Sequence, residues 1–412
     1  MQTLSFDDRR KIPSSQLVSA PEVSLPELEF DRVFHLFGEQ TIPNFMGIRL
    51  CSSPVHIPVV TDRTKALAGR VAAALGVPVS SLPQLVVDAY DVSSILRAMG
   101  DATGSSGGER IGFNVTGGTK PMFAAALAAC HRCNGTAFYV DTYRRTIDFL
   151  SPYRELLQMP RVFSSVDEFV ALAGQTTACP GRWEDDGSRE CRQELTQACW
   201  GSRRLLGQHQ KEVARHNDKR NWHPFEIERG TSTRTRFLAG LDRSGNAEVL
   251  FGDKQFRVSG FPELARYLSG GWLEEHVFRL LSPLHERGTL VDLRIGYCPS
   301  WQHDLPNQEA QEAQEFDVAF TDGYTLTVIE CKAGRVSQEA IQKLENLVMT
   351  YGGPLSRGVL VSAHPLTGSI PTRVSNSRCL GAFSGAAVEQ LPERILHIEP
   401  GTILKAGRTG RR

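Results

Sequence analysis

The chain has 412 residues, which is long enough for two domains of about 150 residues each and a sizeable core. Its 46 basic and 46 acidic side chains balance. This excludes a chain-wide charge that would attract nucleic acid or a membrane surface, but leaves room for a local basic patch. The first residues carry charges without a long apolar run, and no later stretch reaches membrane-spanning length. We therefore expect a cytoplasmic protein.

After a loose extension over residues 1–30, short apolar runs alternate with helical patterns through residues 31–155. Strands alternating with helices favour a parallel sheet covered on both faces, a Rossmann-like α/β fold. Two further apolar runs near residue 150 predict a closing hairpin. The expected strands cover residues 32–37, 55–61, 84–90 and 110–116, and the hairpin covers 136–142 and 146–151.

The segment GFNVTGGTKPM, residues 112–122, predicts a strand, a glycine turn and the start of a helix. Backbone amides of such a turn and of a helix N-terminus can bind phosphate, and Lys120 adds positive charge. The spacing does not fit a Walker A loop, because Pro121 stands where that loop needs a hydroxyl group. The alternative is a tight turn that uses its glycines for geometry alone.

Polar turns also follow the first two predicted strands. In a parallel sheet all three turns lie at the carboxyl ends of the strands, where ligands of such folds bind. The predicted ligand-binding residues are Gln40, Pro43, Asn44, Thr61, Asp62, Arg63, Asn114, Thr116, Gly117, Gly118, Thr119 and Lys120.

The pattern weakens over a connecting region, residues 156–262, and resumes over residues 263–400. Within the connecting region the basic stretch 203–236 contains a helical pattern with few acids, which is either a solvated helix face or a contact for a nucleic-acid backbone. Residues 263–400 read as helix, three strands, helix, strand, an αβββαβ unit. Residues 401–412 form a basic tail.

Asp322-Gly323, between two apolar stretches, predicts a hairpin with a two-residue loop. That loop would place Glu315 opposite Glu330, with Asp317 as the diagonal neighbour. Because side chains alternate along strands, Glu315, Asp317, Glu330 and Lys332 would all project from one face. A loop longer by one residue would scatter them.

Clustered carboxylates repel one another unless a proton or a cation lies between them. Asp and Glu oxygens are the ligands that Mg²⁺ or Mn²⁺ prefers, and a neighbouring lysine can stabilise an attacking hydroxide and the charge on phosphorus. This chemistry suits phosphodiester hydrolysis. The alternative is a surface hairpin with an ordinary Glu–Lys ion pair.

The acid on one strand followed by TVIECK on the next, after a helix that carries a glutamate, resembles the PD-(D/E)xK nuclease superfamily. The resemblance implies a metal-dependent endonuclease of restriction-endonuclease-like fold, with Asp317, Glu330 and Lys332 in the motif positions. Phe316 stands where the family usually has proline before the first acid. Together with Glu315, these residues and a helical glutamate form the predicted catalytic set.

The helix GGWLEEHVF offers two candidates for that helical glutamate. Glu274 lies at the edge of the apolar stripe, whereas Glu275 falls on the outer face with Arg279. We therefore expect Glu274 to face the catalytic hairpin. The predicted metal ligands are Glu274, Asp317 and Glu330.

GEQTIPN with NVTGGTKPM resembles the CARF family, the Rossmann-like sensors of cyclic oligoadenylates in type III CRISPR immunity. The two resemblances together identify an ancillary nuclease with an N-terminal CARF domain. They imply a homodimer that binds its activator, usually cyclic tetra-adenylate, across the two-fold axis and cleaves RNA or DNA. They leave the ring size and the type of nucleic acid open. The alternatives are a ligand-sensing regulator with a non-catalytic nuclease-like domain, and a restriction-type nuclease that needs no activator.

Overall fold

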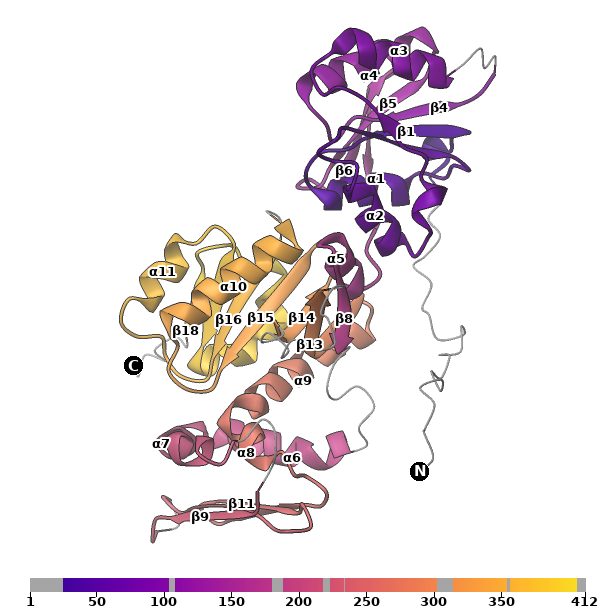
Figure 1. Cartoon of the computed structure of the whole chain (residues 1–412). Coiled ribbons are helices and arrows are strands. Elements are labelled where there is room, and N and C mark those ends of the chain that lie inside the picture. Colours follow the sequence, from indigo (N-terminus) through magenta and orange to yellow (C-terminus); the bar gives the residue numbers. More distant parts are fainter. Residues whose placement is uncertain are drawn as a thin grey trace, which may run out of the picture.

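The structure of the chain is a computed structural model that describes residues 25–103, 108–179, 188–217, 223–232, 234–301, 314–353 and 356–405. Most of the predicted extension, up to residue 24, and the tail from residue 406 on lie outside these ranges. Three β-sheets organise the described residues (Figure 1). None of the helices among them is long and apolar enough to cross a membrane.

The first sheet forms the predicted Rossmann-like domain. Its strand order is β3-β2-β1-β4-β5-β6-β7, parallel from β3 to β5, and antiparallel where β6 and β7 follow. The elements are β1 (Arg32–Leu36), α1 (Thr41–Leu50), β2 (His56–Val60), α2 (Leu67–Leu75), β3 (Leu85–Val86), α3 (Val92–Thr103), β4 (Ile111–Asn114), α4 (Lys120–Arg132), β5 (Thr136–Asp141), β6 (Thr146–Ser151) and β7 (Glu155–Gln158). The parallel sheet and the closing β5–β6 hairpin are as predicted, although β3 is much shorter than the expected strand at 84–90.

Helices cover both faces of this sheet. Buried side chains of α1 and α2 pack in one apolar cluster, and those of α3 and α4 pack in another on the opposite face. Phe34 of β1 stacks on Phe113 of β4 with ring centroids 5.2 Å apart. β4 is buried along its whole length and β1 at every residue but Arg32, as expected for a sheet covered on two sides.

The connecting region contains two parts. β8 belongs to the neighbouring domain, because it pairs with β13, and α5 packs both on α2 of the Rossmann-like domain and on β8. The rest forms a separate four-stranded antiparallel sheet in the order β12-β11-β10-β9, with α6 and α7 on one face. The elements are α5 (Val166–Leu172), β8 (Gln175–Cys179), α6 (Ser188–Gly201), α7 (Arg203–Ala214), β9 (Phe225–Arg229), β10 (Phe237–Leu241), β11 (Ala247–Phe251) and β12 (Lys254–Val258). Figure 1 shows this small domain at the far end of the molecule from the Rossmann-like domain.

The third sheet has the order β18-β17-β16-β15-β14-β13-β8. Its core elements follow the predicted αβββαβ order, from α9 to β16, but two strands, β8 and β18, lie outside the predicted range 263–400. The elements are α8 (Leu264–Arg266), a π-helix (Tyr267–Gly271), α9 (Trp272–Glu286), β13 (Asp292–Trp301), β14 (Phe316–Thr321), β15 (Leu326–Lys332), α10 (Gln338–Tyr351), β16 (Arg357–Ser362), α11 (Ile370–Asn376), β17 (Leu380–Ser384), α12 (Leu391–Arg394) and β18 (Ile403–Lys405).

The two faces of the third sheet carry different helices. The apolar stripe of α10, with Ile341, Leu344 and Leu347, packs on one face. The stripe of α9, with Leu273 and Val277, packs on the other, between this sheet and the small domain. β15 is therefore buried along its length, and only its last residue, Lys332, is partly exposed.

Candidate active site and sensor loops

The β14–β15 hairpin has a four-residue loop, not the predicted two-residue one. Thr321 pairs with Leu326, and the carboxylate of Asp322 accepts hydrogen bonds from the backbone amides of Tyr324 and Thr325 at 3.0 and 2.9 Å. Gly323 adopts a φ of 90°, in the left-handed region that favours glycine. The Asx turn that Asp322 starts therefore lengthens the loop.

The longer loop shifts the strand register by two residues. Val318 pairs with Ile329, so the next position places Asp317 across from Glu330, where Glu315 had been expected. Because the shift is even, each side chain keeps its predicted face. Glu315 instead lies 3.7 Å from Arg266 in an ion pair at the flank of the hairpin.

Asp317, Glu330 and Lys332 come together at the end of the hairpin. Asp317 is 8% exposed and Glu330 2% exposed. The Cys331 amide donates a 2.7 Å hydrogen bond to Oδ2 of Asp317, and Nζ of Lys332 donates to Oε1 of Glu330. Burial, reinforced by the charges of Glu274 and Glu330, holds the pKa of Asp317 well above its usual range.

Two lysines bind the buried Glu330. Burial would lower the pKa of Lys332, but Glu330 and Asp317 outweigh it and hold that pKa above its ordinary value. Lys343 of α10 lies with Nζ 3.5 Å from Oε2 of Glu330. Sequence reasoning missed Lys343, although it stands one residue before the buried Leu344 and so at the edge of the helix stripe.

The helix α9 sends one of its two glutamates to the cluster. The charge of Glu274 contributes to the raised pKa of Asp317, which places Glu274 beside the hairpin as predicted. The expected outer position of Glu275 is wrong. Its carboxylate is 1% exposed and lies between Arg279 at 2.6 Å and Arg192 of α6 at 3.2 Å, because α6 covers that face of α9.

The chemistry of this cluster fits a divalent cation, because a cation bound between carboxylates offsets the repulsion between their negative charges. Among the residues that the structure describes, no three such side chains are spaced to hold an ion as they stand. The two lysines hold Glu330 in this arrangement. Ligation by Glu274, Asp317 and Glu330 would therefore need their side chains to turn.

At the other end of the chain, the first and third predicted ligand turns pack directly together. A side chain on Gly117 would lie 2.2 Å from the backbone oxygen of Leu36 and 2.6 Å from the nitrogen of Gly38. Gly118 has a φ of 79°. These glycines let the loop before α4 meet the loop before α1 at the carboxyl edge of the sheet.

Two predicted ligand residues are buried and build the loops. The side-chain amide of Asn44 bonds both the nitrogen and the oxygen of Gly38, at 3.3 and 3.2 Å. Oδ1 of Asn114 accepts from the backbone and the hydroxyl of Thr116, at 3.1 and 2.6 Å. Pro43 and Asn44 stand in the first turn of α1, which begins at Thr41 within the expected polar turn.

The second turn joins the other two through an exposed ion pair of 2.7 Å between Arg63 and Glu39. Thr61 bonds Thr64 and Asp62 pairs with Lys65, both within the turn. The remaining predicted residues of the set are placed as follows: Gln40 caps α1 and is exposed, Thr119 caps α4 and donates to the oxygen of Ala89, and Lys120 begins α4 and is exposed.

A histidine pair lies beneath these loops that sequence reasoning missed. His35 is fully buried in β1, 3.3 Å from the amide of Asn114 and 3.0 Å from His56. Burial, and next His56, lower the pKa of His35 well below its usual range, and burial lowers the pKa of His56 to about 4, so both rings are neutral at pH 7. The signal was a polar residue in the middle of the apolar run RVFHLF.

Comparison with known families matches both ends of the chain. Residues 33–169 match the Card1 CARF domain, and residues 262–382 match the Card1-like endonuclease domain, which together exceed half of the chain. The chain belongs to the Card1-like family of CARF nucleases, the type III CRISPR ancillary nucleases that its motifs resemble. No curated protein matches it.

Solved structures share the fold of this CARF nuclease over most of its length. Can2 from Sulfobacillus thermosulfidooxidans, in complex with cyclic tetra-adenylate, is 19% identical with a TM-score of 0.66, covering 89% of this chain and 98% of Can2. VC1899 from Vibrio cholerae is 15% identical with a TM-score of 0.68, covering 90% and 97%. A type III CRISPR defence DNA nuclease activated by cyclic oligoadenylate is 16% identical with a TM-score of 0.51, covering 85% and 48%.

Proposed function

We propose that this chain is a metal-dependent endonuclease that a cyclic oligoadenylate switches on in type III CRISPR defence. The observation that supports it is the buried carboxylates of Asp317 and Glu330, beside the half-buried Lys332 and Glu274, in an endonuclease-family domain joined to a CARF domain. Buried carboxylates with a lysine have no evident use in a module that only binds nucleic acid, since they would repel its phosphates.

The activator would bind at the joined loops of the CARF domain. Exposed Gln40, Arg63 and Lys120 and the N-terminus of α4 offer donors and positive charge to phosphates. Can2, which has a similar fold, binds cyclic tetra-adenylate, and we propose the same ring for this chain. A ring with two-fold symmetry suits a homodimer, in which both CARF domains contribute the same loops.

Mg²⁺ or Mn²⁺, held by Glu274, Asp317 and Glu330, would offset the charge of the three carboxylates and of the scissile phosphate. Lys332 would donate a hydrogen bond to the attacking water or to a phosphate oxygen once it leaves Glu330. Asp317 keeps its orientation through the Cys331 amide. Release of Glu330 from Lys332 and Lys343 is therefore the step that the activator has to favour.

The test is cleavage of labelled single-stranded RNA, single-stranded DNA and supercoiled plasmid, with Mg²⁺ or Mn²⁺, with and without synthetic cyclic tetra- or hexa-adenylate. We expect cleavage to need both ring and metal, and to fall at least about 100-fold in Glu330→Gln and Lys332→Ala. Glu315→Gln is the informative comparison, because Glu315 shares the face but pairs with Arg266.

Tight binding of the ring without cleavage of any substrate would instead indicate the ligand-sensing regulator. Cleavage that ignores the ring would indicate a nuclease that needs no activator.

A further inference from the structure

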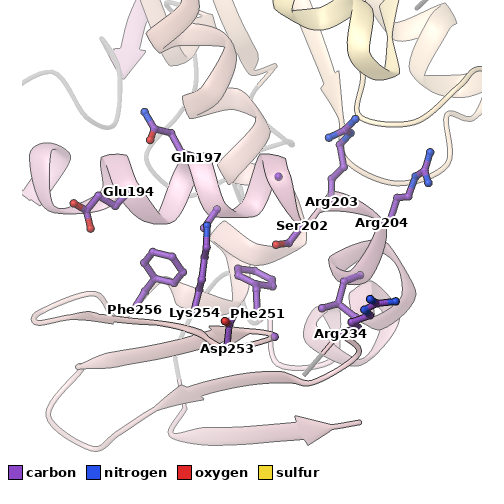
Figure 2. A pocket seen from close by; sticks show the side chains of 14 residues that line it. Glu194, Gln197, Ser202, Arg203, Arg204, Arg234, Phe251, Asp253, Lys254 and Phe256 are labelled. Carbon is purple, nitrogen blue, oxygen red and sulfur yellow. The ribbon is translucent and has the colours of Figure 1, made fainter. Parts of the chain in front are cut away.

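The small domain and α7 border two cavities that the catalytic cluster does not account for. The larger, about 940 Å³, lies between α6–α7 and the β11–β12 strands (Figure 2). The second, about 530 Å³, lies between α7 and the loops that leave β15 and β16. Arg204 lines both cavities, so they adjoin at the start of α7.

The second cavity begins beside the catalytic strand. Gly334 and Arg335, two and three residues after Lys332, line it together with His364. α7 lies close against these loops: a side chain on Gly334 would lie 2.4 Å from Oε1 of Gln210, and one on Gly207 would lie 2.9 Å from the His364 ring. The cavity thus extends from the loop that follows Lys332 to Arg204 at the start of α7.

The larger cavity presents cations without acidic partners. Arg204, Arg234 and Lys254 are exposed and form no ion pair within the described part of the chain. Three arginines on the strands of the same sheet are paired: Arg229 with Glu212 at 2.7 Å, Arg236 with Glu228 at 2.9 Å and Arg257 with Glu248 at 3.1 Å. The cavity is therefore lined by three exposed cations that these acids do not neutralise.

Aromatic surface accompanies the charge. Lys254 and the half-buried Phe256 project from β12 towards α6, while Arg203 and Arg204 point from α7 towards the endonuclease domain (Figure 2). Two acids, Glu194 and Asp253, also line the cavity, with Glu194 at the opposite end from the two arginines. A phenyl ring beside cations is the combination that binds bases and phosphates of a single strand.

We propose that the two cavities form one track for a single-stranded segment of nucleic acid, running from the catalytic cluster past Arg204 to Arg234, Lys254 and Phe256. The inference rests on the proposed nuclease function and adds the strand form of its substrate. An aromatic ring such as Phe256 can stack only on a base whose flat face is accessible. The bases of a duplex are stacked on one another, so a single strand suits this site better.

The experiment measures binding of the whole protein to fluorescent oligonucleotides in metal-free buffer over a series of salt concentrations. The probes are single-stranded RNA, single-stranded DNA and duplex DNA of one length. We expect Arg234→Ala with Lys254→Ala to weaken single-strand binding about 25-fold at 0.1 M salt, and to reduce the salt slope by about 1.4, at about 0.7 per lost phosphate contact.

The matched control is Arg243→Ala with Arg257→Ala. It removes the same formal charge from the same sheet and neither residue lines the cavity, although Arg257, unlike Arg234 and Lys254, is paired with Glu248. We expect it to bind like the wild type. Phe256→Leu keeps an apolar side chain against the core but loses the ring, and should weaken single-strand binding at least about fivefold without changing the salt slope. Thermal melting verifies that each variant is folded.

Equal binding by the cavity variant and its control would overturn the track, as would a preference for duplex DNA in the wild type. Either result would leave the proposed function intact if ring-dependent cleavage is observed. Failure of the wild type to cleave any substrate would remove the nuclease function, whereas a cavity-dependent salt slope would still establish the strand-binding surface.

Discussion

At the scale of single residues, the shared face of Asp317, Glu330 and Lys332 could be predicted because side chains alternate along strands. Asp317, Glu330 and Lys332 stayed on one face even though the loop was longer than expected, since the register moved by two positions. Glu275 could not be predicted, because Arg192, which neutralises it, is more than 80 residues away in the sequence. The apolar stripe of a helix predicts which face packs on the sheet. It does not predict that a second helix, here α6, covers the opposite face.

The raised pKa of Asp317 leads to a test of stability. A carboxylate whose pKa is raised on folding favours the protein below the ordinary pKa, and this contribution is lost as the pH rises through the raised value. At neutral pH without metal, Asp317→Asn should therefore stabilise the fold by about 1 kcal/mol or more, or about 2–4 °C in Tm. The amide oxygen can still accept the Cys331 hydrogen bond.

Differential scanning fluorimetry from about pH 4 to pH 8 measures this effect. The difference between variant and wild type should shrink towards the acidic end, where Asp317 is protonated in the folded chain and, near the ordinary Asp pKa of about 3.9, increasingly also in the unfolded chain. Added Mn²⁺ should raise the Tm of the wild type but not of the variant. A variant that melts below the wild type at neutral pH would show that the charge of Asp317 is compensated.

At the scale of elements, the order of helices and strands was predictable, but the contacts between domains were not. The loop of the catalytic hairpin contacts the CARF domain: Arg145, in the β5–β6 turn, binds Asp322 at 2.9 Å and lies 4.2 Å over the Tyr324 ring. The amides of Val162 and Phe163 both donate to the oxygen of Gly323. Contacts between turns 160 or more residues apart have no local pattern to reveal them.

Through this contact, a movement of the CARF domain would act directly on the hairpin that carries Asp317 and Glu330. We expect Arg145→Ala to leave ring binding within about twofold of wild type and to lower the ratio of activated to basal cleavage at least fivefold, in line with coupling of about 1 kcal/mol or more. Arg144→Ala is the control, since the exposed Arg144 pairs, among the residues that the structure describes, only with Asp141, 3.8 Å away. Equal activation of the two variants would place the coupling elsewhere.

At the scale of the whole molecule, the sequence indicated two domains and a connecting region, and the structure divides that region differently. β8 closes the edge of the endonuclease sheet through β13, more than 110 residues later. The hydroxyl of Tyr351, at the end of α10, donates a 2.6 Å hydrogen bond to the side chain of Gln175 in β8. The place of β8 at the edge of this sheet depends on the packing of the folded chain. Short-range periodicity in the sequence predicts that a strand forms, but not with which distant strand it pairs.

The end of α10 also faces the sensor loops. A cavity of about 690 Å³ is lined by Gln40 and Pro43 of the CARF domain and by Met349 and Tyr351 of α10. The same helix carries Lys343, which holds Glu330. α10 thus runs from the proposed ligand loops to Glu330, the proposed catalytic carboxylate. Binding of the ring at one end and release of Glu330 at the other could therefore share a single movement of this helix.

If one ring lies across the two-fold axis of a homodimer, titration calorimetry should give one ring for every two chains, and sedimentation should give twice the mass of 45.5 kDa. Gly117→Val, whose side chain would meet the backbone of Leu36 and Gly38, should abolish ring binding and activation but leave the dimer. Its control is Gly69→Val, because a side chain at Gly69 meets no neighbouring atom within 4 Å. One ring per chain on a monomer would contradict the shared site, and the Gln40, Arg63 and Lys120 side chains of a single CARF domain would then have to bind the whole ring.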